Sequence, residues 1–198
     1  MVISFRHRLA FLAMPRAASS AIERVLAPRC EIVAGGEPAL KHMTVQRFAK
    51  HFQPLARDYG IGRLETACLF RHPVDWLASW YRYRQRKGVP DPARSTAGLD
   101  FEGFVEGYLA DPQPEWARVG RPARFVGGLG RPPRVDHIFR YEHFDAFAAF
   151  LSARFGEALR FDRINASHGA PVSVDGRLRA RIEAAMDDEM RIWHDIAR

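Results

Sequence analysis

Two segments of the sequence share one pattern: a short apolar run, an abrupt turn that carries an arginine, and then a helix. The first is residues 9–26, LAFLAMPRAASSAIERVL, with Arg16 in its turn. The second is residues 64–87, in which Arg71 follows the nearly continuous apolar run LETACLF. Such a run is typical of a strand buried on both faces of a parallel sheet. The repeated unit therefore favours folds in which strands lead directly into helices.

The rest of the chain continues this alternation. Strands are predicted at residues 2–5, 9–13, 31–33, 64–70 and 135–139, and helices at 20–26, 44–57, 74–87, 101–109, 143–155 and 178–196. Residues 123–126 fit either a strand or a helix. The pattern predicts a three-layer α/β/α fold with a mainly parallel central sheet. With 198 residues, 47% of them hydrophobic, the chain can bury one sizeable core, so we expect a single domain over residues 1–198.

The composition favours an anionic partner. The net charge is +7 and only three of the 30 basic residues are lysines. Arginine suits bidentate contact with phosphate, sulfate and carboxylate, although a GC-rich genome also favours it over lysine. We expect no nucleic-acid partner, because no basic arm or nucleic-acid motif is present. We expect no membrane span either, because no apolar run approaches the ~20 residues required.

Cysteine usage indicates neither a disulfide scaffold nor a metal site. Cys30 and Cys68 both lie in apolar or strand-like context, without C-x-x-C spacing. A cytoplasmic location is the default prediction. The short apolar stretch at residues 8–14 is too brief for a signal peptide and is interrupted by Pro15.

The turn after residue 13 has two interpretations. In one, Arg16, Ser19 and Ser20 surround a phosphate-like or sulfate-like group at the start of a helix, where the helix dipole favours an anion. In the other, Ser20 and Glu23 form a capping box that only satisfies the helix start. The turn lacks glycine and the Gly-Lys-Ser/Thr ending of a nucleotide P-loop, which argues against ATP, GTP and a kinase.

Two further groups of polar residues have a functional and a structural interpretation. Lys41 and His42 lie in a loop before a helix that Thr44 is placed to cap. A histidine there is suited to proton transfer, but a loop histidine beside a lysine is more often a surface residue. The acidic residues 187–189 are interpreted as a solvated helix face rather than a metal site.

Several motifs fall in an order that resembles the sulfotransferases, and most closely small bacterial proteins related to the carbohydrate and heparan-sulfate-type enzymes. In chain order they are MPRAASSAIE, KHMT, CLFRHPVDWLASWYRYR, FRYEHF and NAS. The resemblance spans about residues 9–167. Its most specific part is residues 71–79, where Arg-x-Pro is followed by a serine eight positions after the arginine. The resemblance implies a P-loop-like nucleotide-binding core, 3′-phosphoadenosine 5′-phosphosulfate (PAPS) as donor and adenosine 3′,5′-bisphosphate as product.

The resemblance also implies the residues that hold the donor. Arg71 and Ser79 would bind the 3′-phosphate. The 5′-phosphosulfate would lie on the first turn, formed by Arg16, Ala17, Ala18, Ser19 and Ser20. Family members usually carry lysine at position 16 and glycine or threonine beside it, so this turn departs from the pattern. Weaker nucleotide contacts are implied for Arg124 and Arg140, and a structural or nucleotide-supporting role for Asn165 and Ser167.

The implied chemistry is transfer of a sulfuryl group to a hydroxyl or an amine, without a metal. His42 is the implied general base. Arg16 would clamp the leaving phosphate, and Lys41 would stabilise charge on the sulfuryl group or on that phosphate. The acceptor is not readable from the sequence, and a carbohydrate is one candidate. The loops at residues 88–98 and 111–122 carry no recognisable code for it. The alternative is a non-catalytic module that binds a nucleotide or another polyanion.

Overall fold

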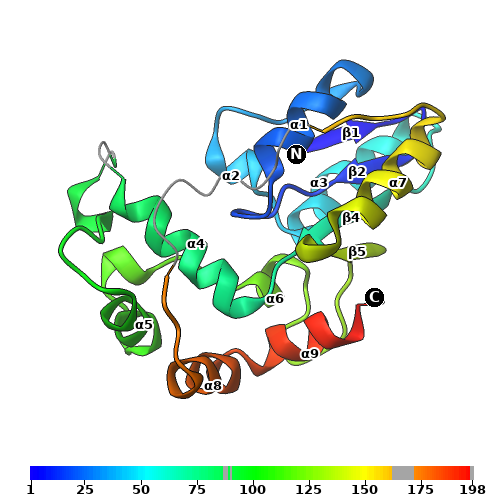
Figure 1. The fold of residues 1–198 in the computed structure, drawn as a ribbon. Coiled ribbons are helices and arrows are strands. Elements are labelled where there is room, and N and C mark those ends of the chain that lie inside the picture. The colour runs from blue at the N-terminus through cyan, green and yellow to red at the C-terminus, as the bar shows by residue number, and fades with distance from the viewer. Residues whose placement is uncertain (87–88, 90, 162–171, 197–198) are drawn as a thin grey trace.

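The sheet of this chain is mixed rather than mainly parallel. The structure, a computed structural model, describes residues 1–86, 89, 91–161 and 172–196 (Figure 1). Five strands pair in the order β3-β1-β2-β4-β5: β1 (Val2–Ser4), β2 (Leu9–Phe11), β3 (Ile32–Val33), β4 (Glu65–Phe70) and β5 (His137–Arg140). Strands β2, β4 and β5 are parallel, whereas β1 is antiparallel to both of its neighbours. The prediction of a mainly parallel sheet is therefore wrong. Residues 5–8 link β1 to β2 by a turn too short for the crossover that parallel strands need.

Helices lie on both faces of the sheet. On one face Phe11 and Phe139 pack on Phe147 of α7 (Phe144–Phe155), with ring centroids 5.8 and 5.4 Å away. Arg140, the next residue along β5, turns to the other face and reaches α9 (Asp187–Asp195). Figure 1 shows α3 (Val45–Asp58) behind the sheet and α7 in front of it. The fold is thus of the α/β class, as the sequence predicts.

A second cluster of buried side chains lies away from the sheet. It joins α4 (Pro73–Gln85), α5 (Phe101–Leu109) and α8 (Gly176–Ala185), at the left and bottom of Figure 1. Helix α4 connects this cluster to the sheet, because it begins where β4 ends. Its Trp76 donates from Nε1 to the carbonyl oxygen of Pro15 at 3.1 Å. The turn after β2 is therefore fixed against α4.

The shorter elements complete the chain. They are α1 (Ser19–Leu26), α2 (Pro38–Lys41), α6 (Pro122–Phe125) and the 3-10 turns Ala27–Arg29, Pro92–Arg94, Glu115–Ala117 and Tyr141–His143. Residues 123–126, left open by the sequence, are thus largely helical. None of the helices described has the length and apolar character that a bilayer crossing needs.

The C-terminal region differs from its prediction in two ways. The single helix expected at residues 178–196 is interrupted at Met186, whose ψ of 41° leaves the helical range. Glu189, interpreted as part of a solvated face, is fully buried and accepts hydrogen bonds from Arg121 and from the N–H of Ala123. The interruption allows α9 to take its own direction, which turns Glu189 toward α6.

Candidate functional site

The turn after β2 leads into α1 without a side-chain cap, and it presents backbone N–H groups at the start of that helix. Its N-cap residue is Ala18, which has φ 55°, and Arg16 has φ 65°. The left-handed region costs a non-glycine residue about 1–2 kcal/mol, so the surrounding structure must hold this turn. Within the described part of the chain, the N–H groups of Ser19 and Ser20 have no protein acceptor. The turn therefore presents free donors at the positive end of a helix.

The capping-box interpretation of this turn is wrong. Ser20 does not bond to the backbone of its own helix; its Oγ accepts a hydrogen bond from Nζ of Lys41 at 2.9 Å. Glu23 pairs with the same Nζ at 3.1 Å. Both residues hold α2 against α1, because the left-handed turn at Ala18 takes the place of a side-chain cap.

Arg16 turns from this loop toward α4. Its Nε donates to Oγ of Ser79 at 3.1 Å, and its guanidinium lies 4.4 Å from the ring centroid of Tyr83. Burial lowers the pKa of Arg16 to about 10, and the positive charges of Arg71, Arg86 and Arg82 act in the same direction. Arg16 stays protonated at neutral pH, so several positive charges share one half-buried region.

Arg71 connects the turn after β4 to the turn after β2. It follows β4 directly, and its Nη1 donates to the carbonyl oxygen of Arg16 at 3.4 Å. Its guanidinium lies 4.5 Å from the ring centroid of Tyr141. The pairing of β2 with β4 explains this contact, because the carboxyl ends of neighbouring parallel strands meet at one edge of the sheet. Nε of Arg71 is buried and has no hydrogen-bond partner among the described residues.

Helix α4 supplies the remaining members of the site. Ser79 is 2% exposed. Arg82 has a buried Nε that also lacks a partner among the described residues, and burial, followed by the charge of Arg71, lowers its pKa. The guanidinium of Arg86 covers Tyr83 at 3.7 Å. No motif in the sequence pointed to Arg82, Tyr83 or Arg86 as site residues. Arg82 and Tyr83 lie three and four residues after Ser79 on the same helix face, and this spacing would have identified them. Arg86 lies just beyond the end of α4, in an extended conformation.

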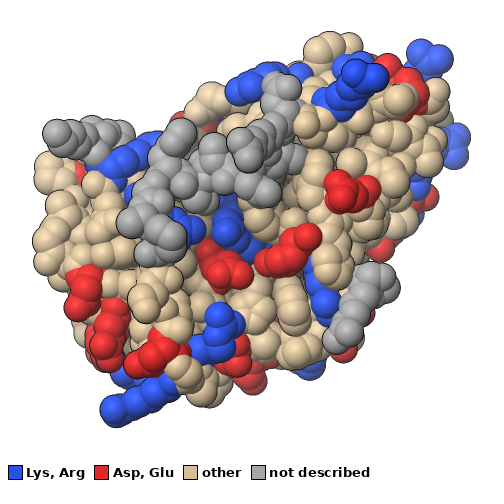
Figure 2. Space-filling model, in the orientation of Figure 1, with Lys and Arg blue, Asp and Glu red and all other residues tan. Residues whose placement is uncertain are grey.

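We call Arg16, Arg71, Arg82 and Arg86 the arginine cluster. None of the four makes an ion pair with a carboxylate in the described residues. Figure 2 shows basic and acidic side chains close together near the centre of the drawn face, where α4 lies in Figure 1. Arg16, Arg71 and Arg82 are half-buried and Arg86 is exposed, and the Nε atoms of Arg71 and Arg82 lack a partner among the described residues. Such an arrangement is suited to an anion of more than one negative charge.

His42 lies at the same edge of the sheet. Its Nδ1 is 2.6 Å from the carbonyl oxygen of Ala13, two residues beyond the end of β2. A carbonyl only accepts, so Nδ1 carries the proton and Nε2 of the neutral ring has a free lone pair. Burial lowers the pKa of His42 below its ordinary value, against the opposing effect of the Ala13 bond. The neutral form that a general base requires therefore dominates at pH 7.

Lys41 is less available than the sequence suggested. Its Nζ is shared between Ser20 and Glu23, so most of its charge is balanced within the fold. The structure nevertheless places it beside the start of α1. Lys41, His42 and the turn that contains Arg16, Ala17, Ala18, Ser19 and Ser20 thus form one continuous group with Arg71 and Ser79.

Other predicted site residues lie elsewhere. Arg140 is 6% exposed and donates to the carbonyl oxygens of Trp193 and His194 at 3.1 and 3.3 Å, which ties β5 to the end of α9. Arg124 is exposed on α6, and its charge acts on Tyr108, next to a different pocket. Asn165 and Ser167 lie outside the described residues. No group of three or more His, Cys, Asp or Glu in the described ranges is placed to hold a metal ion.

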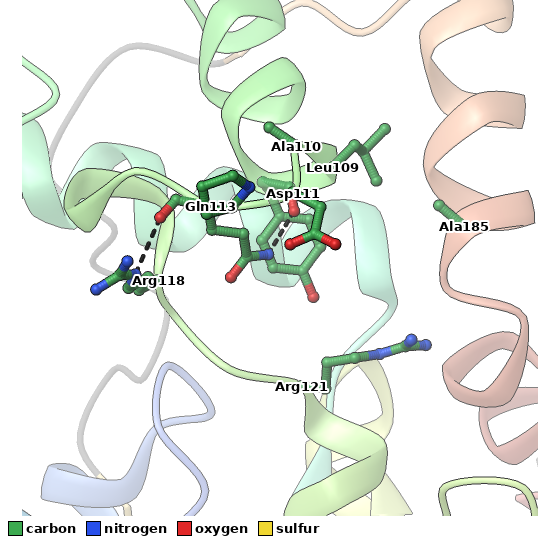
Figure 3. Close-up of a pocket in the computed structure, with 9 residues that line it drawn as sticks. Leu109, Ala110, Asp111, Gln113, Arg118, Arg121 and Ala185 are labelled. Atoms are coloured by element: carbon green, nitrogen blue, oxygen red, sulfur yellow. Dashed lines mark hydrogen bonds between the residues drawn. The ribbon is translucent and has the colours of Figure 1, made fainter.

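The pocket near Tyr108 shows arginines in a different setting (Figure 3). This α5 pocket, of about 610 Å³, lies between α5, the loop that follows it and α8. Arg118 donates to the carbonyl oxygen of Gln113 at 2.9 Å and pairs with Glu115 at 3.0 Å. Arg121 holds buried Glu189 through two nitrogens. Both arginines are already paired within the fold, so the α5 pocket is a weaker candidate for binding an anion.

Comparison with known proteins identifies no relative of this chain. No family model, no curated protein and no solved structure matches the chain.

Proposed function

We propose that this chain is a sulfotransferase that uses PAPS as donor and a hydroxyl or amine of an unidentified acceptor, with a carbohydrate among the candidates. The observation that carries the proposal is the arginine cluster, whose four guanidiniums make no ion pair in the described residues. PAPS carries anionic groups at two ends of one nucleotide, which matches a site assembled from two turns. The order of the sequence motifs supports the same choice.

The residues fit the two ends of the donor. The free N–H groups of Ser19 and Ser20, together with Arg16, suit the 5′-phosphosulfate. Arg71 and Arg82, each with a buried Nε that lacks a partner in the described chain, suit the 3′-phosphate. These donors replace the glycine-rich backbone of a common P-loop. We therefore propose a P-loop-like nucleotide site that is built on arginines and on a left-handed alanine.

The donor supplies an S–O bond that breaks as sulfur bonds to the acceptor, leaving the electron pair on the phosphate of adenosine 3′,5′-bisphosphate. His42 takes the acceptor proton at Nε2, because Nδ1 is held by Ala13. Arg16 stabilises the charge that develops on the leaving phosphate. Lys41 orients α1 through Ser20 and Glu23, and contributes less charge than an unpaired lysine would.

The paired state of Lys41 favours a second candidate, a module that binds the nucleotide or another polyanion without catalysis. This module would use the same arginine cluster. The two candidates differ in His42, which is needed only for transfer.

Calorimetric titration with adenosine 3′,5′-bisphosphate, AMP, ATP and a short RNA tests both candidates. We expect the bisphosphate to bind about ten-fold or more tightly than AMP, because the second phosphate adds charged hydrogen bonds of about 1.5–3 kcal/mol. Equal affinity for the two nucleotides would overturn the nucleotide site. Transfer of label from sulfur-labelled PAPS to an acceptor then separates an enzyme from a binding module.

A further inference from the structure

A carboxylate lies beside the arginine cluster without pairing with it. Strands β4 and β5 pair as far as Phe70 and Arg140, and just beyond them the N–H of His72 donates to Oε1 of Glu142 at 3.0 Å. Glu142 is therefore next to the residue that follows Arg71. In the described residues no ion pair joins Glu142 to an arginine. A carboxylate bonded to Arg71 would balance its charge and compete with an external anion.

Donors of the fold occupy both oxygens of Glu142. Oε1 accepts the N–H of His72, and Oε2 accepts Nε1 of Trp193, on α9, at 3.3 Å. The rings of His72 and Trp193 meet edge to face with their centroids 4.9 Å apart, which holds the indole in place. Glu142 itself is exposed, so its carboxylate has room to turn once one of these two hydrogen bonds is removed.

Arg140 fixes Trp193 from the other side. Its Nε donates to the carbonyl oxygen of Trp193 at 3.1 Å, and its guanidinium lies 4.0 Å from the ring centroid of the same residue. The residue after Arg140 is Tyr141, whose ring faces the guanidinium of Arg71 at 4.5 Å. The short segment 140–142 therefore connects α9 to the arginine cluster.

We infer that Trp193 is a positioning residue that keeps the carboxylate of Glu142 away from Arg71, and that α9 thereby sets the affinity of the arginine cluster for anions. Without the indole donor, Oε2 of Glu142 loses its partner. Arg71, whose buried Nε has no partner in the described residues, is a neighbouring cation that can take its place. An ion pair within the fold then replaces contact with the ligand. This role rests on the proposed function only in taking the arginine cluster as the anion site.

The first test needs no ligand. Trp193→Phe keeps an aromatic ring but removes the indole N–H. In the ¹⁵N-labelled full chain, the guanidinium N–H correlations report on each arginine, and those of Arg71 are identified by their absence in Arg71→Lys. We expect the Arg71 proton resonances to move downfield in Trp193→Phe, because a charged hydrogen bond to Glu142 forms. Unmoved resonances in the folded variant would refute the inference.

The second test measures the affinity for inorganic pyrophosphate by calorimetry. Trp193→Phe should weaken binding about five-fold, which is the effect of one partly exposed ion pair. Glu142→Gln keeps an acceptor for both donors but carries no charge, so it should bind pyrophosphate at least as tightly as the natural chain. The double variant Trp193→Phe/Glu142→Gln should regain the natural affinity. A loss that persists in the double variant would assign the effect of Trp193 to packing and overturn the inference.

A matched control and a separate ligand keep the two proposals apart. Trp116→Phe makes the same change on the 3-10 turn Glu115–Ala117, which packs on Gly107 of α5, and should alter neither the Arg71 resonances nor the affinity. An equal loss in this control would contradict the role given to Trp193. The nucleotide site fails on its own if adenosine 3′,5′-bisphosphate and AMP bind equally, while pyrophosphate still responds to Trp193→Phe. A natural chain that does not bind pyrophosphate would instead exclude the control of anion affinity by α9.

Discussion

The arginine cluster and the α5 pocket use the same residue type for opposite purposes. In the α5 pocket, Arg121 holds a fully buried carboxylate, Glu189, and Arg118 holds Glu115. In the cluster, Arg16 and Arg71 contact a hydroxyl, a carbonyl and aromatic rings, but no carboxylate in the described residues. Pairing with a carboxylate neutralises a guanidinium within the fold. A half-buried guanidinium without such a partner instead stays available to an external anion.

The difference teaches how to separate structural from functional arginines in a chain that contains 27 of them. The useful criterion is whether the fold already satisfies the donors of the guanidinium, with a carboxylate or with backbone carbonyl oxygens, rather than pocket size. Arg140 has no carboxylate partner in the described residues either, but it is nearly buried and its Nε and Nη2 donate to helix-end carbonyl oxygens, so it holds the fold although its motif suggested otherwise. Arg82, overlooked in the sequence, keeps a buried Nε without a partner among the described residues, so by the same criterion it is a candidate for binding a ligand.

The largest effect is expected beside the cluster, at His42. His42→Ala should lower turnover by roughly 10²–10⁴ and leave donor affinity nearly unchanged, because the side chain is needed only for proton transfer. Single-turnover transfer from labelled donor and calorimetry with adenosine 3′,5′-bisphosphate measure the two quantities. Arg16→Ala is the contrasting variant and should reduce both.

Full turnover in His42→Ala would reassign the base, with Glu142 and Glu23 the next residues to test. Glu142 already accepts hydrogen bonds from the N–H of His72 and from Nε1 of Trp193. Glu23 is paired with Lys41. Their existing partners make both weaker candidates than His42.

The next largest effect is on stability in the α5 pocket. Glu189→Ala should lower the free energy of unfolding by about 3–5 kcal/mol, because it removes one partner of a buried ion pair and leaves Arg121 without compensation. Urea denaturation followed by circular dichroism measures the loss. The matched variant Glu115→Ala removes a partly exposed partner of Arg118 and should cost at most about 1 kcal/mol. Similar losses in the two variants would contradict the distinction between buried and surface pairs.

A third effect is on ligand selectivity in the cluster. Arg71→Ala should remove most of the preference for adenosine 3′,5′-bisphosphate over AMP, about ten-fold or more, and Arg71→Lys should restore only part of it. The free energy of unfolding without ligand should change by less than about 1 kcal/mol, because the lost contact with Tyr141 is offset by reduced repulsion from Arg16 and Arg82.

Two further variants make this test specific. Arg82→Ala should also weaken binding of adenosine 3′,5′-bisphosphate, because Nε of Arg82, like that of Arg71, is buried without a partner among the described residues. Arg118→Ala, at a paired arginine, should leave nucleotide affinity unchanged. If Arg118→Ala weakened binding as much as Arg71→Ala, the pairing criterion would fail.

The smallest effect concerns pH. His72 caps α4 by accepting at Nδ1 the N–H of Val74 at 3.3 Å, which requires an unprotonated Nδ1. Burial lowers the pKa of His72, against the opposing charges of Asp75, Glu183 and Glu142 and assisted by Arg179. The unfolded chain thus binds this proton at a higher pH than the folded chain does. The contribution of the His72 cap to the free energy of unfolding is complete above the unfolded pKa of ~6.5 and is lost as the pH falls below that value.

His72→Asn keeps a cap acceptor without the titration. Between pH 7.5 and 5.5 its stability should fall less than that of the natural chain, by up to about 1 kcal/mol, the usual strength of a cap. His42, whose pKa is also lowered, adds acid sensitivity that this variant retains. His51→Asn, at an exposed position of α3, is the control and should keep the full pH dependence. Equal pH dependence in all three proteins would show that His72 does not act as the cap.

Local patterns in the sequence were sufficient for most elements and for part of the site. The apolar run before Arg71 and the proline after it locate β4 and the start of α4. Thr44 caps α3 as predicted, accepting from the N–H of Arg47 at 3.5 Å. These features depend on neighbours within a few residues, which the sequence displays directly. The two turns with Arg16 and Arg71 were predictable for the same reason.

Tertiary structure alone decided the pairing of strands and of charges. The sequence did not reveal that β1 runs antiparallel, that Glu189 is buried against Arg121, or that Arg140 serves α9. The partner of a charged side chain lies 50 or more residues away in these last two pairs, as with Arg16 and Ser79. The sequence does not show whether a carboxylate lies beside a given guanidinium. Because burial and pairing set its free energy, only the folded arrangement separates the arginines that hold the fold from those left for a ligand.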